Sequence, residues 1–228
     1  MKPLIYVYVD HPMCSYDCAD ATCEVLNKSN LYNAQLIGPD SFPYVHFCKK
    51  NISKAKCLVF PGGEGDADQF DKHLTFYRRV VVNYVNNGGK YLGICQGSYF
   101  ASKHYFNLLS GYVARQYIKT NKPSTRRCGP AIVDIKWQDD TDRTIYFHDG
   151  AAFIPESKVK EETKILGIYK NDTIASLIQR HKKGAVGVIG PHPEAMRWWF
   201  YCQRIIRSGW TNELQHDILL DIMKNLLK

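Results

Sequence analysis

Short apolar runs alternate with amphipathic stretches along the first two-thirds of the chain. The runs are rich in β-branched and aromatic residues, which is typical of buried strands. Strands are predicted at residues 4–9, 34–38, 57–60 and 90–93. Helices are predicted at residues 19–28 and 66–86 and from Gln96 onward, because apolar residues recur there at helical spacing. Strands that alternate with helices predict an α/β fold with a mainly parallel sheet.

The middle of the chain indicates antiparallel pairing instead. Strands are predicted at residues 131–137, 144–148, 164–169 and 173–179, separated by polar turns. A last buried strand is predicted at 184–189, and helices at 195–206 and 212–227 complete the chain. No internal repeat, low-complexity tract or long linker divides the sequence. We therefore expect a single domain over residues 1–228, with helices flanking the sheet and an antiparallel extension.

Composition excludes several other classes of protein. The chain has 228 residues, of which 45% are hydrophobic and 23% charged, as in ordinary globular proteins. Its apolar runs are shorter than the ~18 residues of a membrane-spanning helix, and the N-terminal run has no signal-peptide cleavage site. We therefore expect a cytoplasmic protein without a membrane partner. The eight cysteines are expected to be reduced, and the spacing of Cys14, Cys18 and Cys23 matches no zinc pattern.

The balance of charge is basic. Thirty lysine and arginine residues outnumber twenty-two acidic residues, which gives a net charge of +8. The basic residues gather at 119–127 and 180–183, without the interleaved aromatic residues that a nucleic-acid surface would supply. We interpret them as solvated loops and expect no nucleic-acid partner.

A cysteine between two glycines follows the strand predicted at 90–93. Residues 93–98 read GICQGS, the cysteine form of the nucleophile elbow G-x-S-x-G. Glycines are needed because the turn is tight and side chains would clash. The elbow also places the sulfur at the start of the next helix, which favours the reactive thiolate. We interpret Cys95 as a nucleophile rather than as a small buried residue.

A histidine and a glutamate follow the last predicted strand. Residues 190–194 read GPHPE, and residues two apart in extended backbone project to the same side, so Glu194 can reach His192. A carboxylate on one imidazole nitrogen leaves the other nitrogen for the cysteine. His192 alone would be read as a loop residue held between prolines. Because Cys95 ends an equivalent strand, we expect His192 to be its base.

A glycine-rich loop ends the strand predicted at 57–60. Residues 60–66 read FPGGEGD and lack the Lys-Ser/Thr pair of a phosphate-binding P-loop, so a nucleoside triphosphate is not expected. Glycines let main-chain N–H groups approach a developing oxyanion, and the 62–63 turn with the Gln96 amide would supply two donors. Asp66 or Asp68 in the same loop can also cap the next helix.

In this order and at these strand ends, the three motifs resemble those of the class I glutamine amidotransferase-like superfamily. Within it the chain looks most similar to the family named for the N-terminal domain of biotin-protein ligase. The resemblance covers residues 4 to about 196 and includes GGKYLGICQGSY at 88–99 and FHDGAAF at 147–153. Ligase activity is not expected, because the chain has no Gly-Arg-Gly-Arg-type biotin-adenylate loop.

The resemblance implies a flavodoxin-like sheet and a particular chemistry. The implied catalytic triad is Cys95, His192 and Glu194, acting through a thioester intermediate. The implied oxyanion hole consists of the main-chain amides of Gly63 and Gln96. Nothing in the sequence requires a metal ion or an organic cofactor.

One position departs from the glutaminases of this superfamily. They usually carry glutamine two positions after the second glycine of the elbow, where this chain has Tyr99. A phenol cannot supply the paired donor and acceptor of an amide, so specificity for glutamine is in doubt. Glu64, Tyr99, His148 and Asp149 are the candidate substrate contacts, because the resemblance and the order of the motifs bring them to one rim. His148 also fits a strand-end residue that caps the following turn.

The leading hypothesis is a glutamine amidotransferase-like cysteine hydrolase that acts on a small-molecule or peptide amide. The alternative is a non-catalytic regulatory or binding module that keeps the fold, with Cys95 as an ordinary or redox-sensing thiol. A peptidase of the related intracellular-protease branch ranks last, because that branch usually has histidine after the cysteine and this chain has Gln96. The aromatic run at 196–201 is expected in the core, although it and Trp210 would also fit a protein-partner surface.

Overall fold

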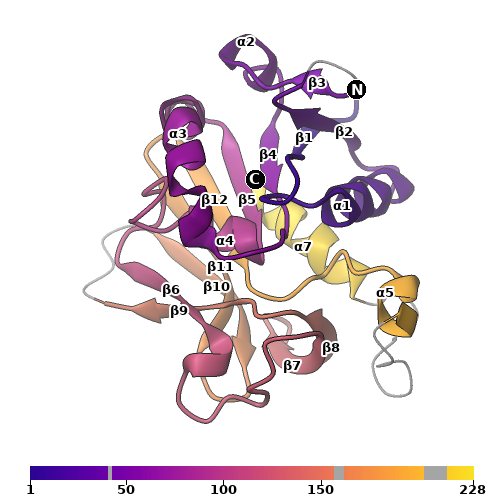
Figure 1. The fold of residues 1–228 in the computed structure, drawn as a ribbon, viewed down its shortest axis with the longest axis vertical. Helices are drawn as coiled ribbons and strands as arrows, with labels where there is room; N and C mark the ends of the chain where they lie inside the picture. The colour runs from indigo at the N-terminus through magenta and orange to yellow at the C-terminus, as the bar shows by residue number, and fades with distance from the viewer. Residues whose placement is uncertain (41–42, 157–161, 203–214) are drawn as a thin grey trace.

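The computed structural model describes residues 1–40, 43–156, 162–202 and 215–228. Within these residues, twelve strands form one mixed sheet. Ten of them lie in the order β3-β2-β1-β4-β5-β12-β11-β10-β7-β8, and β6 and β9 pair beside this path. Figure 1 shows the parallel strands in the upper part of the view and the antiparallel strands below them.

The parallel half reverses its strand order beside β1. It contains β1 (Leu4–Tyr8), β2 (Asn33–Gly38), β3 (Val45–His46), β4 (Cys57–Phe60), β5 (Lys90–Ile94) and β12 (Gly184–Ile189). β2 and β3 extend the sheet on one side of β1, and β4, β5 and β12 extend it on the other. Ligands of open α/β sheets bind at the carboxyl ends of the strands near such a switch point.

The antiparallel extension is joined to the parallel half through β12. It contains β6 (Tyr112–Gln116), β7 (Ala131–Trp137), β8 (Asp142–Phe147), β9 (Ala151–Pro155), β10 (Thr163–Tyr169) and β11 (Ile174–His181). β12 pairs in parallel with β5 on one edge and antiparallel with β11 on the other. The turn between β8 and β9 therefore comes to the carboxyl ends of β5 and β12.

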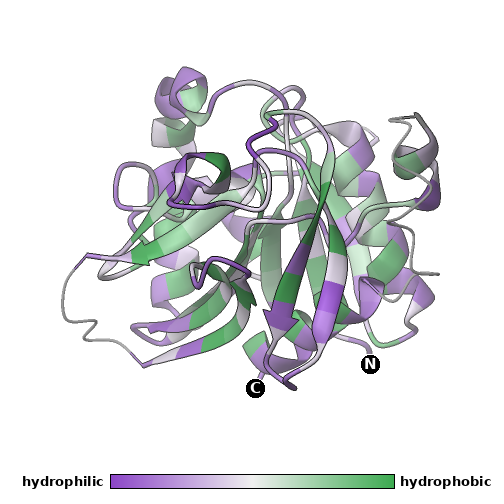
Figure 2. Cartoon of the chain, turned by 90° about the horizontal axis from the view of Figure 1, so that it is seen from below, coloured by the Kyte–Doolittle hydropathy of each residue, from purple (hydrophilic) through white to green (hydrophobic). Residues whose placement is uncertain are grey.

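Helices cover both faces of the parallel half. The helical segments are α1 (Tyr16–Lys28), α2 (Lys49–Ile52), α3 (Asp71–Asn86), α4 (Gln96–Phe100), α5 (Arg197–Cys202), α7 (His216–Leu226) and the 3-10 turns η1 (Ala67–Phe70) and η2 (Tyr117–Lys119). Side chains alternate along β1, so that Ile5 and Val7 pack with α1 and α7, whereas Tyr6 and Tyr8 pack with α3. Figure 2 shows hydrophobic residues along the strands and hydrophilic residues on many of the outer loops.

The predicted α/β class and the antiparallel extension are confirmed. β4, β7 and β12 have the predicted bounds. α1 begins at Tyr16 rather than at residue 19, because the Ser15 side chain caps it by accepting a hydrogen bond from the Cys18 amide at 3.3 Å. The helix predicted at 66–86 is η1 followed by α3.

Five elements of the described residues have no counterpart in the sequence prediction: β3, α2, β6, β9 and the 3-10 turn η2. β3 and α2 are too short to show a periodic pattern. β6 reads YVARQ and is only partly buried, so its pairing with β9 depends on contacts far along the chain. Residues 203–206 and 212–214 of the predicted C-terminal helices lie outside the described residues, as does Trp210.

Candidate active site

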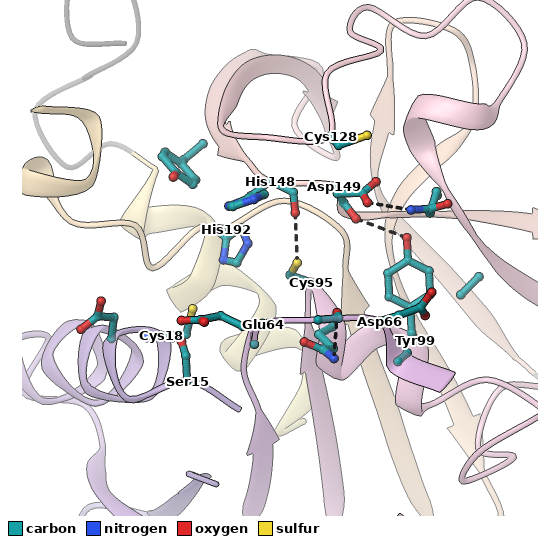
Figure 3. Close-up of a pocket in the computed structure, with 18 of the residues that line it drawn as sticks. Ser15, Cys18, Glu64, Asp66, Cys95, Tyr99, Cys128, His148, Asp149 and His192 are labelled. Carbon is teal, nitrogen blue, oxygen red and sulfur yellow. Dashed lines mark hydrogen bonds between the residues drawn. The ribbon is translucent and has the colours of Figure 1, made fainter. Parts of the chain in front are cut away.

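A cleft of about 900 Å3 lies at the carboxyl ends of β4, β5 and β12. Gly63 after β4, Cys95 after β5 and His192 after β12 all line it, as Figure 3 shows for the two side chains. The turn between β8 and β9 adds His148 and Asp149 from the extension. The predicted site residues are thus brought to one place, apart from Glu194, which lies behind His192.

Cys95 has the backbone conformation of a nucleophile elbow. Its φ of 48° and ψ of −109° are unusual for a residue with a side chain. A Cβ on Gly97 would lie 1.8 Å from the carbonyl oxygen of Phe60, and one on Gly93 would lie 2.4 Å from that of Gly97. The Tyr91 hydroxyl donates a hydrogen bond to the same Gly97 oxygen at 2.7 Å. Both glycines are therefore required by the backbone packing around the cysteine.

The Cys95 thiol points into the cleft from a well-fixed position. The main-chain N–H of Cys95 donates to the Ile189 oxygen at 2.9 Å, which ties the elbow to the end of β12. Its Sγ donates to the main-chain oxygen of His148 at 3.5 Å (Figure 3). The residue is 6% exposed. A substrate carbonyl must therefore reach the sulfur from the cleft side.

His192 and Glu194 form a buried pair. Nδ1 of His192 lies 2.9 Å from Oε1 of Glu194. The main-chain N–H of His192 donates to the main-chain oxygen of Tyr146 at 2.9 Å. Burial by itself would lower the pKa of His192, but the Cys95 thiol and the Glu194 carboxylate outweigh it and raise this pKa well above its usual value. The Glu194 carboxylate thus holds the imidazole in one orientation and favours its protonated form.

The two amides of the implied oxyanion hole carry no competing bond. Among the described residues, no acceptor is hydrogen-bonded to the main-chain N–H of Gly63 or Gln96, and both residues line the cleft. The next amide, that of Glu64, donates to the Pro12 oxygen at 2.8 Å. A Cβ on Gly63 would lie 2.1 Å from the Met13 oxygen, so only glycine fits there.

The four candidate substrate contacts surround the cleft with different exposure. Glu64 and His148 are exposed, whereas Tyr99 and Asp149 are half-buried. Although the His148 residue is exposed, the protein around its ring partly removes water, and this desolvation, followed by the charges of His192 and Arg127, lowers the pKa of His148. The Tyr99 hydroxyl donates to the main-chain oxygen of Asp149 at 3.4 Å, so the tyrosine supports the turn between β8 and β9.

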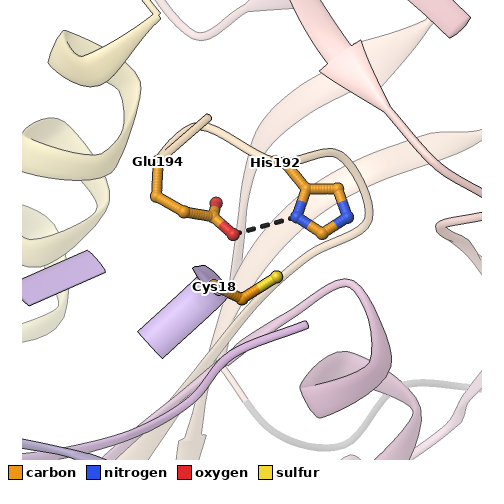
Figure 4. A group of neighbouring side chains, drawn as sticks. All are labelled: Cys18, His192 and Glu194. Atoms are coloured by element: carbon orange, nitrogen blue, oxygen red, sulfur yellow. Dashed lines mark hydrogen bonds and ion pairs between the residues drawn. The ribbon is translucent and has the colours of Figure 1, made fainter. Parts of the chain in front are cut away.

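Cys18 is a site residue that the sequence prediction missed. Figure 4 shows its sulfur beside the His192–Glu194 pair, and one ligand atom from each of the three residues lies within 4.8 Å of the others. Burial raises the pKa of Cys18, although the His192 hydrogen bond opposes this rise. Sulfur, imidazole nitrogen and carboxylate oxygen are zinc ligands. Within the described parts of the chain, these three residues form the group that could hold a metal ion. In the sequence, the only indication that Cys18 approaches His192 is its position in the first turn of α1, after β1.

The aromatic run after His192 divides between core and surface. Trp199 and Phe200 are buried against Tyr146, and the ring centroids of Trp199 and His192 lie 5.6 Å apart. Trp198 and Tyr201 are 48% and 45% exposed. Trp199 and Phe200 therefore lie in the core as expected, whereas Trp198 and Tyr201 do not.

Comparison with known proteins places this geometry in context. Residues 49–108 match the family described as biotin-protein ligase, N terminal. One chain of the structure of PurLQS from Thermotoga maritima superposes with a TM-score of 0.64 at 17% identity, covering 100% of both chains. A solved glutamine amidotransferase superposes with a TM-score of 0.62 at 14% identity, covering 98% of both chains. The chain has a glutamine amidotransferase-like fold.

The relationship to biotin-protein ligase is partial in length. The chain is 28% identical over 163 residues to the biotin--protein ligase of Schizosaccharomyces pombe. This match covers 60% of the chain and 25% of the ligase. The predicted resemblance to the amidotransferase-like superfamily and to the ligase N-terminal family is confirmed. Within the part of the chain that the structure describes, no helix is long and apolar enough to cross a membrane.

Proposed function

We propose that this protein is a cysteine-dependent amide hydrolase of the glutamine amidotransferase-like type. The observation that carries the proposal is the conformation of Cys95, with φ at 48°, in the same cleft as a His192 that is hydrogen-bonded to Glu194. Strained backbone at a cleft cysteine is costly to maintain and is typical of functional sites. A packed structural thiol would gain nothing from it.

The reaction follows from the placement of these groups. The Cys95 thiolate attacks the amide carbon, and the resulting oxyanion accepts hydrogen bonds from the Gly63 and Gln96 amides. The C–N bond then breaks as the His192 imidazolium gives its proton to the leaving nitrogen, which leaves a thioester on the sulfur. Water loses a proton to His192 and attacks the thioester, releasing a carboxylic acid and the thiol. Glu194 holds the imidazole in one tautomer throughout.

A non-catalytic binding module is the second candidate. The side chain of Tyr99 favours it, because this residue stands where glutaminases usually have glutamine and its hydroxyl donates to the protein's own Asp149 oxygen. In that case a small molecule or a protein partner would occupy the cleft, and Cys95 would show no special reactivity.

Alkylation separates the two candidates within a single protein. Cys128 is an exposed thiol that lines the same cleft, so it serves as the internal reference for access. At about pH 6, iodoacetamide should label Cys95 at least ~10-fold faster than Cys128, because a free thiol is almost wholly protonated there. His192→Ala should remove this advantage, and Glu194→Gln should reduce it. Peptide mass spectrometry gives both rates.

Turnover is the second half of this test. Primary amides should release ammonia with the wild type, and Cys95→Ser should abolish the release while leaving the circular dichroism spectrum unchanged. Equal labelling of Cys95 and Cys128 in wild type and His192→Ala would favour the binding module.

A further inference from the structure

The cleft differs in charge from the chain as a whole. Although the chain carries a net charge of +8, the ionisable carboxyl groups that line the cleft are Asp17, Glu64, Asp66, Asp68 and Asp149. Among the described residues of its wall, Lys119 is the only lysine or arginine. An anionic substrate would therefore enter against the local charge, whereas a cationic one would be attracted.

Two residues of the cleft wall carry unpartnered acceptor atoms. Oδ1 of Asp149 and Oε1 of Gln96 are buried oxygens without a hydrogen-bond partner among the described residues. Gln96 is 5% exposed and follows Cys95 in sequence, and both residues line the cleft. Buried acceptors left without a donor are costly, so each points to a ligand N–H. The Trp199 indole N–H is unpartnered too, but it lies on the side of His192.

Asp149 has one hydrogen-bonded carboxylate oxygen and one buried oxygen, Oδ1, that has no partner among the described residues. Its Oδ2 accepts a hydrogen bond from the Gln116 side chain at 2.6 Å, and its φ of 49° turns the chain sharply after His148 (Figure 3). The main-chain oxygen of the preceding residue, His148, is 3.5 Å from the Cys95 sulfur. Asp149 therefore directly follows a residue that contacts the nucleophile. Burial raises the pKa of Asp149, although the Gln116 hydrogen bond and the Lys119 charge oppose this rise, and the Asp66 carboxylate adds to it least. A bound cation would lower this pKa further.

We propose that the cleft takes amides that carry a positively charged amino or guanidino group, bound by the Asp149 carboxylate. This inference rests on the proposed function and names its substrate class. The ammonium would satisfy Oδ1 of Asp149 with a charge-assisted hydrogen bond while the amide carbon faces Cys95. Substrates with a free carboxylate at that end would be disfavoured by the acidic wall.

Three primary amides of matched length test the charge preference. δ-Aminovaleramide is cationic, hexanamide replaces its ammonium by methyl, and adipamate replaces it by a carboxylate. We expect kcat/KM for ammonia release to be at least ~10-fold higher for δ-aminovaleramide than for hexanamide, the effect of one hydrogen bond to a charged group. Adipamate should be the poorest substrate. Equal values for the three amides would overturn the proposal.

Variants assign the preference to the Asp149 carboxylate. Asp149→Asn keeps a residue that tolerates positive φ, and it should bring δ-aminovaleramide to within about twofold of hexanamide. Asp172→Asn is the matched control, because Asp172 also has positive φ, at 64°, but is exposed and lies outside the cleft. Should Asp149→Asn fail to fold, Asp66→Asn removes a neighbouring charge and keeps the helix cap, and it should lower the preference two- to threefold. A preference unchanged in the folded variants would refute the assignment.

Binding separates this proposal from the proposed function. Calorimetric titration of Cys95→Ala with the same three amides measures the charge preference without turnover. Tighter binding of δ-aminovaleramide in the absence of any wild-type turnover would refute the hydrolase and support the cation site. Turnover of all three amides with equal affinity would support the hydrolase and refute the cation site.

Discussion

Two buried glycines, Gly97 in the parallel half and Gly167 in the antiparallel extension, face different kinds of neighbour. In the parallel half, main chain packs against main chain: a Cβ on Gly97 would meet the Phe60 carbonyl oxygen at 1.8 Å. At Gly167 in the extension a side chain makes the corresponding contact, because a Cβ would meet the Trp137 ring at 2.9 Å. The turn between β8 and β9 resembles the parallel half, since a Cβ on Gly150 would lie 2.1 Å from the Gly190 carbonyl oxygen. Backbone cannot move aside as a ring can, so Gly97 is the less tolerant of the two positions.

The two regions also have different proposed roles at the cleft. The parallel half carries the reacting thiol and the amides of the oxyanion hole, which need positions fixed to a fraction of an ångström. The extension contributes the turn with His148 and Asp149, whose side chains would set which substrate fits. Residues that select a ligand are commonly carried on such connecting segments.

Gly97→Ala is expected to have the largest effect. The added methyl group collides with main chain on β4, so we expect a loss of more than about 3 kcal/mol in unfolding free energy, or no folded protein. Gly167→Ala should cost less, because Trp137 can shift. Gly129→Ala is the control, since its nearest contact would be the Arg127 side chain at 3.5 Å. Urea unfolding in which Gly97→Ala matched Gly129→Ala would contradict the comparison.

Sequence predicted the parallel half well because its signals are local. β4 and β12 are continuous apolar runs that are buried along their whole length, and both have the predicted bounds. β7 was predicted equally well in the extension, because its apolar residues are dense. β6 and β9 were missed because one is polar and the other directly follows the 149–150 turn. Their pairing is determined by tertiary contacts that no short pattern encodes.

The site residues divide in the same way, into those with a local sequence signal and those placed by tertiary contacts. Cys95, His192 and Glu194 could be proposed from sequence because each stands in a short motif at a strand end. Cys18 could not, since its approach to His192 depends on the Ser15 cap that sets where α1 begins. The unpartnered oxygen of Asp149 could not be predicted from the sequence either, because it depends on the tertiary packing around this side chain.

Aromatic packing offers a second, smaller test of the comparison. Phe60 in the parallel half contacts the rings of Tyr8, Tyr91, Phe100 and Phe106, with centroids 4.6 to 6.4 Å apart. Phe60→Leu should therefore cost about 2–3 kcal/mol of unfolding free energy, since each aromatic pair adds about 0.5–1.5 kcal/mol.

Phe147 is the matched residue of the extension. It is also fully buried but contacts only the rings of Tyr117 and Tyr169 among the described residues. Phe147→Leu should cost about 1 kcal/mol less than Phe60→Leu in the same denaturation assay. An equal or larger loss for Phe147→Leu would mean that the extension is packed as rigidly as the parallel half.

Two aspartates provide the finest test, because their environments shift their pKa values in opposite directions. Burial tends to raise the pKa of Asp134 on β7, but Lys170 and a 2.8 Å hydrogen bond from Thr144 outweigh it and lower this pKa. The carboxylate therefore stabilises the fold above the unfolded-state pKa, and the gain is lost as pH falls through the lowered value. Asp134→Asn should destabilise the protein at pH 7 by less than about 1 kcal/mol, since the pair is partly exposed.

Asp149 should behave in the opposite way. Its pKa is raised, chiefly by burial, so the native state favours the protonated form. That stabilisation is present below the unfolded-state pKa of about 3.9 and is lost as pH rises through the raised value. Asp149→Asn should therefore stabilise the protein at pH 7, by up to about 1 kcal/mol, and the gain should shrink toward pH 4. Urea unfolding at both pH values measures this change, with the exposed Asp172→Asn as the control. A destabilised Asp149→Asn would mean that the carboxylate supports the fold, whereas a stabilised variant fits a carboxylate retained for a ligand.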